Sequence, residues 1–487
     1  MVFNSTSLQP NLQPNLLVMK FGGTSMGSAA RIRIAAQLAA EQYRERPLVV
    51  VVSAMSRITD LLLDTLRKAE AGDEGDLEAN LAQLSERHAK TCRELLPEAR
   101  QKCALERIDV LIQEFTRIAR GMMLLGERPP RSVDEAVAVG ERLSALLMAE
   151  YLESEGIPAA DVNGSAVIAT DAVFGNASPL MEQTRERSAK VLQPLLGRRV
   201  LPIVTGFNGS TLDGRPTTLG RGGSDFSASI LAAVLDAAEL WIWTDVDGIM
   251  TGDPRLIPDA LVLDAVTYAE AAELAYNGAK VLHPRTLAPL AERGIPVWSK
   301  NSFAPEKPGT RIVPRLESVH GPHAVTSMPD VALVSIEPAT GSLSGTMLMA
   351  RSLEALGRAN VELLAMTSSS YRQSFCFLVR QSELERAAGF LEQDLALELA
   401  HGYLKPLQVD PNVGLIAVVG EGMRGTPGLA GRIFTAISQH HINIIAIAQG
   451  SSELTIAIVV HRAGLEQAVR AIHEECGLGK RETAMDA

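Results

Sequence analysis

The chain has 487 residues, of which 46% are hydrophobic and 21% charged, and this composition is typical of a globular protein of roughly three domains. The net charge is −11 and the sequence contains no basic cluster. Both observations argue against a dedicated nucleic-acid binder and against a protein that binds anionic membranes. The sequence has no apolar run of 18 residues, so we expect no membrane span. Its N-terminus lacks a basic region followed by an apolar run, so we expect no secretory signal. The four cysteines are scattered without a C-x-x-C pair, which favours a reducing compartment such as the cytoplasm.

Residues 1–16 contain a repeated Leu-Gln-Pro-Asn and are predicted to form a flexible tail. From 17 to 313, short apolar runs rich in β-branched residues alternate with amphipathic helices such as 28–41, 133–155 and 224–236. This pattern predicts an α/β domain whose mostly parallel sheet is sandwiched by helices. Residues 60–130 are charged and rich in Leu and Ala, and we expect them to form a helical insertion. The loop-like stretch 314–328 is predicted to be a linker.

Two similar halves follow the linker, at 329–408 and 409–480, before a short tail at 481–487. The stretch MTSSSYRQSFCFLV (366–379) matches IAQGSSELTIAIVV (447–460) in the pattern of its side chains. Each half reads as a βαββα unit, so we predict two ferredoxin-like domains in tandem. Small domains of this kind commonly bind small molecules at strand and loop edges.

The strongest local signal is Lys20-Phe21-Gly22-Gly23-Thr24-Ser25, which lies directly after a predicted strand and before a predicted helix. Glycines at a helix start let backbone N–H groups approach an anion, and the lysine adds a full charge, so the segment favours phosphate binding. The order of a Walker A loop is absent, and a tight turn with a surface lysine remains the alternative.

Polar and glycine residues also follow other predicted strands, at Ser53 with Thr59, at Gly206 before Phe207, and at Thr244 with Asp245. Ligands of open parallel sheets bind at the carboxyl ends of the strands, so these positions indicate one site.

The stretch Thr217–Asp225 contains groups suited to an amino acid. Arg221 offers a planar fork for a carboxylate, and Asp225 together with Glu141 offers negative charge for an ammonium group. The alternative is that Ser224 caps a helix next to a solvated ion pair. Lys280, in Gly278–Pro284, supplies a second lysine for phosphate oxygens, whereas His283 before a proline is predicted to be structural. A carboxylate nucleophile is already ionised at neutral pH, so phosphoryl transfer to it needs no general base, only positioning, Mg²⁺ and cations.

The segment Gly420–Gly425 matches G-x-G-x-x-G, a pattern that also occurs in dinucleotide-binding folds. The next strand ends in Gln449 rather than in an acidic residue, and too little chain follows for such a fold. We therefore interpret it as an effector-binding loop.

Six motifs in this order, KFGGTS, SAMSRIT, VGERLS, TTLGRGGSD, IWTDVDGIMTGDPR and GAKVLHPRT, resemble the aspartokinases of the amino-acid kinase superfamily. The two C-terminal repeats resemble the tandem ACT domains of the same enzymes, and the resemblance covers roughly residues 17–475. It implies phosphorylation of the L-aspartate β-carboxylate by ATP with Mg²⁺, the first step towards lysine, threonine and methionine. It also implies feedback by threonine or lysine through the ACT domains, and a homodimer or higher homo-oligomer formed through them.

The resemblance also implies residue roles. Lys20 and Lys280 would stabilise the phosphate oxygens of the reaction, and Gly22, Gly23 and Thr24 would cradle them. Arg221 would bind the aspartate α-carboxylate, with Glu141, Ser224 and Asp225 at the amino end and Ser53, Thr59 and Phe207 lining the pocket. Thr244, Asp245, Asp253 and Arg255 would surround the nucleotide and its metal, while no dedicated protein metal site is expected. The effector would bind at Gly420, Gly422, Gly425, Gln449 and Ser451.

Three positions depart from the family pattern, at Arg57, Asp60 and Met250. Some threonine-sensitive relatives are fused to homoserine dehydrogenase, and because this chain ends at Ala487 we expect that second activity to be absent. Two alternatives remain open, a kinase for another acidic amino acid and a catalytically inactive amino-acid sensor that uses only its ACT domains.

Overall fold

The computed structural model describes residues 15–279, 281–317, 320–339, 344–369 and 374–479. The chain divides into two compact units, the first formed by 1–248 with 282–314 and the second by 249–281 with 315–487. All four cysteines are free thiols. Over the described ranges, no helix combines the length and the apolar character that crossing a membrane requires.

The first unit contains β1 (Leu17–Phe21), α1 (Ala29–Glu45), β2 (Leu48–Val52), α2 (Ile58–Glu70), α3 (Glu74–Leu95), α4 (Glu98–Leu125), α5 (Pro130–Val137), α6 (Val139–Ser154), β3 (Ala159–Val162), α7 (Gly164–Val167), α8 (Met181–Gly197), β4 (Leu201–Thr205), β5 (Asn208–Ser210), β6 (Pro216–Thr218), α9 (Gly223–Val234), β7 (Glu239–Thr244), α11 (Pro284–Ala291), β9 (Val297–Asn301) and β10 (Thr310–Val313). Its main sheet has the strand order β3-β4-β2-β1-β7-β9-β10. All neighbours are parallel except β9 and β10.

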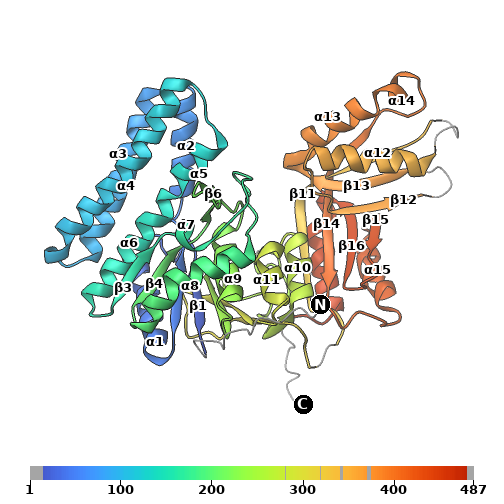
Figure 1. Ribbon diagram of the computed structural model, residues 1–487. Helices are drawn as coiled ribbons and strands as arrows, with labels where there is room; N and C mark the ends of the chain where they lie inside the picture. The colour runs from blue at the N-terminus through green and yellow to red at the C-terminus, as the bar shows by residue number, and fades with distance from the viewer. Residues whose placement is uncertain (1–14, 280, 318–319, 340–343, 370–373, 480–487) are drawn as a thin grey trace, which may run out of the picture. The chain divides into compact units, whose positions relative to one another are not determined.

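The central strands β1, β2 and β4 are buried at every position, which explains their unbroken apolar sequences. The predicted insertion is formed by α2, α3 and α4, and Figure 1 shows α3 and α4 running side by side in blue and cyan. The predicted α/β class with a mostly parallel sheet is confirmed. Because β1, β2, β4 and β7 point the same way, their carboxyl ends meet at one edge of the sheet.

The helix predicted at 133–155 is wrong in one respect, since the structure divides it at Ala138 into α5 and α6. Gly140, in the first turn of α6, packs so tightly that an added Cβ would lie 3.0 Å from the Cβ of Ala54. Contact with the segment after β2 therefore fixes the start of α6, and sequence periodicity carries no signal of that contact.

The second unit contains β8 (Ala265–Thr267), α10 (Tyr268–Tyr276), β11 (Ala324–Ile336), α12 (Gly345–Arg358), β12 (Ala365–Ser368), β13 (Phe375–Arg380), α13 (Leu384–Asp394), α14 (Ala396–Ala400), β14 (Gln408–Val419), α15 (Leu429–Gln439), β15 (Ile444–Gln449), β16 (Thr455–His461) and α16 (Leu465–Glu475), with short 3₁₀ turns at Gln381–Glu383 and Arg462–Gly464. Six strands form an antiparallel sheet in the order β12-β13-β11-β14-β16-β15. The long strands β11 and β14 pair at its centre, so the two repeats share one continuous sheet.

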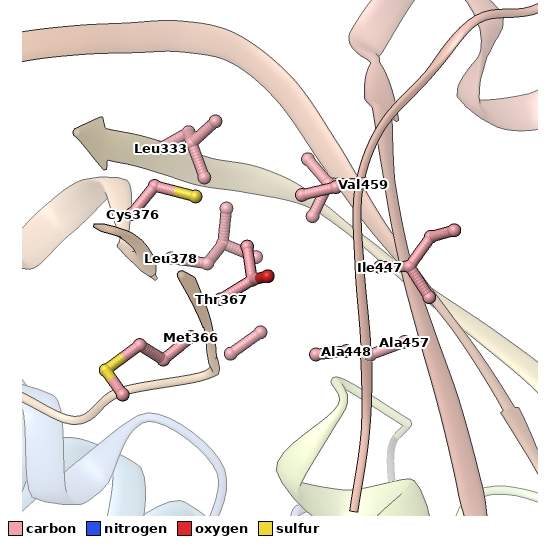
Figure 2. A pocket seen from close by; sticks show the side chains of 11 residues that line it. Leu333, Met366, Thr367, Cys376, Leu378, Ile447, Ala448, Ala457 and Val459 are labelled. Carbon is pink, nitrogen blue, oxygen red and sulfur yellow. The ribbon is translucent and has the colours of Figure 1, made fainter. Parts of the chain in front are cut away.

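Helices α12 and α13 cover one end of this sheet and α15 and α16 the other, on the same face. The opposite face carries a separate apolar layer that includes Leu378, Leu415 and Val459. Figure 2 shows side chains of β12 and β13 facing those of β15 and β16 across a gap of only about 10 Å³. On the two edge strands, Met366 and Ile447 remain 37% and 41% exposed.

Candidate active site

A cavity of about 640 Å³ lies at the carboxyl ends of β1, β2 and β4. All seven residues predicted to contact aspartate line it, namely Ser53, Thr59, Glu141, Phe207, Arg221, Ser224 and Asp225. Lys20 and Gly23 of the predicted phosphate loop line it as well. The fold thus gathers residues spread over 205 positions of sequence, from Lys20 to Asp225, on the wall of one cavity. Their roles in binding remain predictions.

Lys20 lies in β1, is 7% exposed, and points its ammonium at Asp225, with 2.6 Å between Nζ and Oδ1. A Cβ at Gly22 would lie 3.3 Å from this Nζ, and a Cβ at Gly23 would lie 3.1 Å from the carbonyl oxygen of Ala54. Gly22 therefore leaves room beside the ammonium, and Gly23 lets the loop approach the backbone of Ala54. The alternative of a surface lysine after a tight turn is wrong.

Glu141 is a buried charged group of the cavity wall, with 3% of its surface exposed. Burial raises the pKa of this carboxyl to about 8, although hydrogen bonds from the backbone of Ala54 and of Glu141 itself oppose the rise. Its Oε2 has no hydrogen-bond partner within the part of the chain that the structure describes. A buried carboxyl with an unused oxygen on a cavity wall is suited to receive a cation.

Arg221 is exposed and lies at the cavity, and no ion pair joins it to a carboxylate of the described residues. The helix that follows, α9, begins with Gly222 as its N-cap, at φ +71°, without a side-chain cap. The alternative role of Ser224 as the N-cap is therefore wrong. A guanidinium at the cavity and a buried carboxyl within it form a complementary pair for the two charged ends of an amino acid.

Two non-glycine residues of the cavity wall have left-handed backbone, Phe207 at φ +69° and Arg57 at φ +63°. This conformation costs energy for residues with a Cβ and is enriched at functional sites. Close packing surrounds Phe207 in this conformation, because a Cβ at Gly223 would lie 2.7 Å from the Phe207 ring. The departures at Arg57 and Asp60 therefore both lie on the cavity wall.

Asp134 is a residue of this site that sequence reasoning missed. It is 1% exposed and accepts hydrogen bonds from the backbone N–H groups of Gly175 and Thr218 and from the Thr218 hydroxyl, at 2.8–2.9 Å. Burial raises the pKa of its carboxyl, while these hydrogen bonds lower it, and the rise prevails. It thus fixes β6 just before Arg221. One sequence signal could have identified it: Asp134 lies seven residues before Glu141, which places both residues near the same face of the helix predicted over 133–155.

The residues predicted around the nucleotide are not gathered in this cavity. Thr244 and Asp245 lie at the end of β7, outside the cavity lining. The neighbouring Asp247 pairs with Lys307 and accepts a hydrogen bond from Asn301, both at 2.6 Å.

Asp253 and Arg255 belong to the second unit, where they form an ion pair with each other. Lys280 lies outside the described residues. His283 accepts a hydrogen bond from the backbone of Arg285 at the start of α11, which agrees with a structural role.

The predicted effector loop, residues 420–428, joins β14 to α15. Gly420 and Gly422 pack directly on residues 320–323, where a Cβ at either position would approach backbone atoms within 2.8 Å. The N–H of Gly425 donates to the carboxylate of Glu453 at 2.8 Å. The nearby side chains of Gln449 and Ser451 are exposed. Two of the glycines therefore have a packing role, and effector binding at this loop remains a prediction.

Comparison with known proteins finds two family matches in this chain. Residues 15–301 match the amino acid kinase family, and residues 416–476 match an ACT domain. Bifunctional aspartokinase/homoserine dehydrogenase 1 of Arabidopsis thaliana is 33% identical over 96% of this chain and 52% of its own length. The aspartokinase of Schizosaccharomyces pombe is 30% identical over 94% of this chain and 92% of its own length. The chain spans about half the length of most curated relatives that it matches.

Solved structures give the same answer. Escherichia coli aspartokinase III in complex with aspartate and ADP superposes with a TM-score of 0.81 at 30% identity, covering 94% of this chain and 99% of that one. The same enzyme in complex with lysine and aspartate gives a TM-score of 0.77 at 30% identity, covering 95% and 99%.

Proposed function

Since the chain belongs to the aspartokinases of the amino acid kinase family, we propose that it transfers the γ-phosphoryl group of ATP to the β-carboxylate of L-aspartate, forming 4-phospho-L-aspartate and ADP. The observation that carries the proposal is the cavity of the first unit, which joins the buried carboxyl of Glu141, the guanidinium of Arg221 and the ammonium of Lys20. The complex of the E. coli relative with aspartate and ADP supports aspartate and an adenine nucleotide as the ligands.

In this proposal Arg221 holds the α-carboxylate through two parallel hydrogen bonds, and Glu141 faces the α-ammonium. Ser53, Thr59, Phe207 and Ser224 complete the walls around the substrate. With the α-carboxylate and the α-ammonium bound in this way, the β-carboxylate is directed towards the phosphate side of the cavity. Its oxygen is ionised at neutral pH and attacks without a general base.

Lys20 acts on the phosphoryl group. Its ammonium, held by Asp225, lies beside Gly22, in the loop that is proposed to bind phosphate oxygens. Positive charge fixed at the place where negative charge develops lowers the barrier, because it requires no reorganisation during the reaction. Lys280 is proposed as a second cation, and Thr24 completes the loop.

ATP and Mg²⁺ are proposed as the co-substrate and its ion. Among the described residues no three His, Cys, Asp or Glu side chains gather into a metal-binding group. Mg²⁺ in phosphoryl-transfer enzymes is usually bound by substrate phosphates with one or two carboxylates. Asp245 is the proposed carboxylate, with Thr244 beside it, and Asp253 and Arg255 are carried over from the family pattern as further proposed nucleotide contacts. The ion would neutralise phosphate charge during transfer.

We further propose that the enzyme catalyses the first step towards lysine, threonine and methionine in the cytoplasm, and that threonine or lysine inhibits it. The ACT match and the lysine complex of the E. coli relative support an amino-acid effector. A homodimer through residues 330–480 is proposed as the working unit. The exposed apolar side chains of Met366 and Ile447 on the edge strands support it.

The direct test traps the acyl phosphate with hydroxylamine in the presence of ATP, with either L-aspartate or L-glutamate. The proposal expects aspartate hydroxamate and little product from glutamate. With the α-carboxylate and α-ammonium held in place, the extra methylene of glutamate would shift its side-chain carboxylate away from the phosphate. Preference for glutamate would indicate a kinase for another acidic amino acid, and no hydroxamate with either would favour an inactive sensor.

A further inference from the structure

Helix α10 of the second unit begins with a capping box that has an unusual feature. Thr267 Oγ1 accepts from the N–H of Glu270 at 3.1 Å, and Glu270 Oε2 accepts from the N–H of Thr267 at 2.8 Å. Glu270 is 0% exposed, although a capping-box glutamate usually lies at the surface. A fully buried carboxylate requires partners for both of its oxygens.

The second oxygen of Glu270 supplies a connection between distant parts of the second unit. Oε1 accepts from the backbone N–H of Glu421 at 2.7 Å and pairs with His323 Nδ1 at 2.8 Å. Glu421 lies in the loop 420–428, and His323 immediately precedes β11. Burial would raise the pKa of Glu270, but the bonds from His323, Thr267 and Glu421 outweigh it and lower that pKa, so the carboxylate is charged. The same carboxylate raises the pKa of His323.

The other end of α10 is held by the six-stranded sheet. Glu273 Oε2 accepts from the Thr455 hydroxyl at 2.8 Å, and the carbonyl of Asn277 accepts from the Thr326 hydroxyl at 3.3 Å. Gly278, at φ +95°, approaches Met328 so closely that a Cβ would lie 2.4 Å from its side chain. In sequence, Ala279 and the predicted phosphate lysine, Lys280, follow directly.

We propose that Glu270 is a positioning residue that couples the loop 420–428 to helix α10 and so to the segment that leads to Lys280. The proposal rests on the proposed function, since it gives that loop and that lysine their roles. An amino acid bound at the loop competes for the N–H of Glu421 or turns its peptide. The buried carboxylate of Glu270 then loses a partner, and α10 has to readjust to satisfy it.

Glu270→Gln is the informative change. A glutamine has one acceptor oxygen, so it can accept a hydrogen bond from either the Thr267 N–H or the Glu421 N–H. Its NH₂ group then faces a donor at the other position. Glu273→Gln is the matched control, one turn later on the same helix, because it alters the bond to Thr455 and leaves the loop untouched.

Hydrogen–deuterium exchange on the full chain tests the coupling without any ligand. We expect Glu270→Gln to accelerate exchange in both 268–279 and 419–428, roughly tenfold or more at the most affected amides. Glu273→Gln is expected to leave 419–428 unchanged. Faster exchange in only one of the two segments, or in neither, would overturn the coupling.

His323 provides a milder pair of variants in case Glu270→Gln fails to fold. Asn places an amide donor near the position of the imidazole Nδ1, whereas Ala provides none. His323→Ala should therefore accelerate exchange in both segments, and His323→Asn should restore most of the protection. Equal exchange in the two variants would contradict a role for this donor.

Kinetics separate this inference from the proposed function. With an active wild type, Glu270→Gln should lower kcat roughly tenfold, change the aspartate KM less than twofold, and reduce inhibition by threonine or lysine. Unchanged kcat and inhibition would remove the inference and leave the proposed function standing. A wild type without hydroxamate-forming activity would remove the proposed function, and the exchange result would still decide the coupling.

Discussion

At the scale of single residues, the environment of Glu141 determines how the cavity responds to a cation. The carboxyl is buried, its pKa is raised to about 8, and it is therefore mostly protonated at pH 7. An α-ammonium beside it favours the charged form, so aspartate binding should release a proton from this group.

The release is measurable by calorimetric titration of aspartate at pH 7 in buffers of different ionisation enthalpy. We expect about one proton released per aspartate bound by the wild type and close to none by Glu141→Gln. Affinity should rise between pH 7 and pH 8.5, as Glu141 becomes ionised before binding. Equal proton release by the two proteins would assign the ammonium to another group.

Arg221 tests the opposite end of the substrate. Arg221→Lys keeps the charge but loses the planar fork, so the aspartate KM should rise about tenfold or more while the ATP KM changes little. Arg215→Lys is the matched control, because Arg215 is exposed and pairs with Asp213 outside the cavity lining. A larger effect on the ATP KM would place Arg221 on the nucleotide side.

At the scale of elements, the strands of the first unit were predictable because their apolar runs are buried on both faces. The order of the strands in the sheet depends on long-range pairing that leaves no local pattern. Asp134 illustrates the same limit at the site, since its partners Gly175 and Thr218 are 41 and 84 residues away. Predicting strand ends thus located most of the cavity, but not the groups that hold it in shape.

The helical insertion contains a buried histidine that should make it sensitive to acid. His88 in α3 is 0% exposed, bonds the Leu84 carbonyl through Nδ1 at 2.8 Å, and burial lowers its pKa to about 4. The folded protein binds this proton less readily than the unfolded chain, so the stability it contributes is present above about pH 6.5 and is lost as pH falls towards 4.

Lowering the pH from 7 to 4.5 should reduce the free energy of unfolding of the wild type by roughly 2–3 kcal/mol through His88, and the His88→Leu variant should lack this decrease. Urea unfolding of both proteins at the two pH values measures the difference, with the exposed His461→Ala as the control. Parallel losses in wild type and His88→Leu would show that other groups cause the acid sensitivity.

At the scale of the whole molecule, the two repeats form one sheet through β11 and β14, which the sequence repeat alone does not reveal. The repeat predicted two similar units, but the pairing of their central strands depends on contacts between residues 73 to 95 positions apart, from Ser335 with Gln408 to Ala324 with Val419. The domain limits at 313 and 408 stay predictions, as does the effector site.

Gln449→Ala tests that effector site. At fixed aspartate, the wild type should be inhibited by threonine, or else by lysine, and the variant should need several-fold more of the same amino acid. Gln439→Ala, exposed at the end of the neighbouring α15, is the control. A wild type inhibited by neither amino acid would remove the effector claim, whereas unchanged inhibition in the variant would place the site elsewhere in the second unit.

The central claim is that the cavity around Lys20 transfers phosphate to aspartate, and it is tested most directly by Lys20→Ala in the hydroxylamine assay with parallel calorimetric titration of aspartate. We expect hydroxamate formation to fall roughly 100-fold or more, because the lost charge acts mainly in the transition state. Aspartate affinity should change only a few-fold, and Lys90→Ala, on the exposed surface of α3, should match the wild type. Undiminished hydroxamate formation by a folded Lys20→Ala protein would contradict the account.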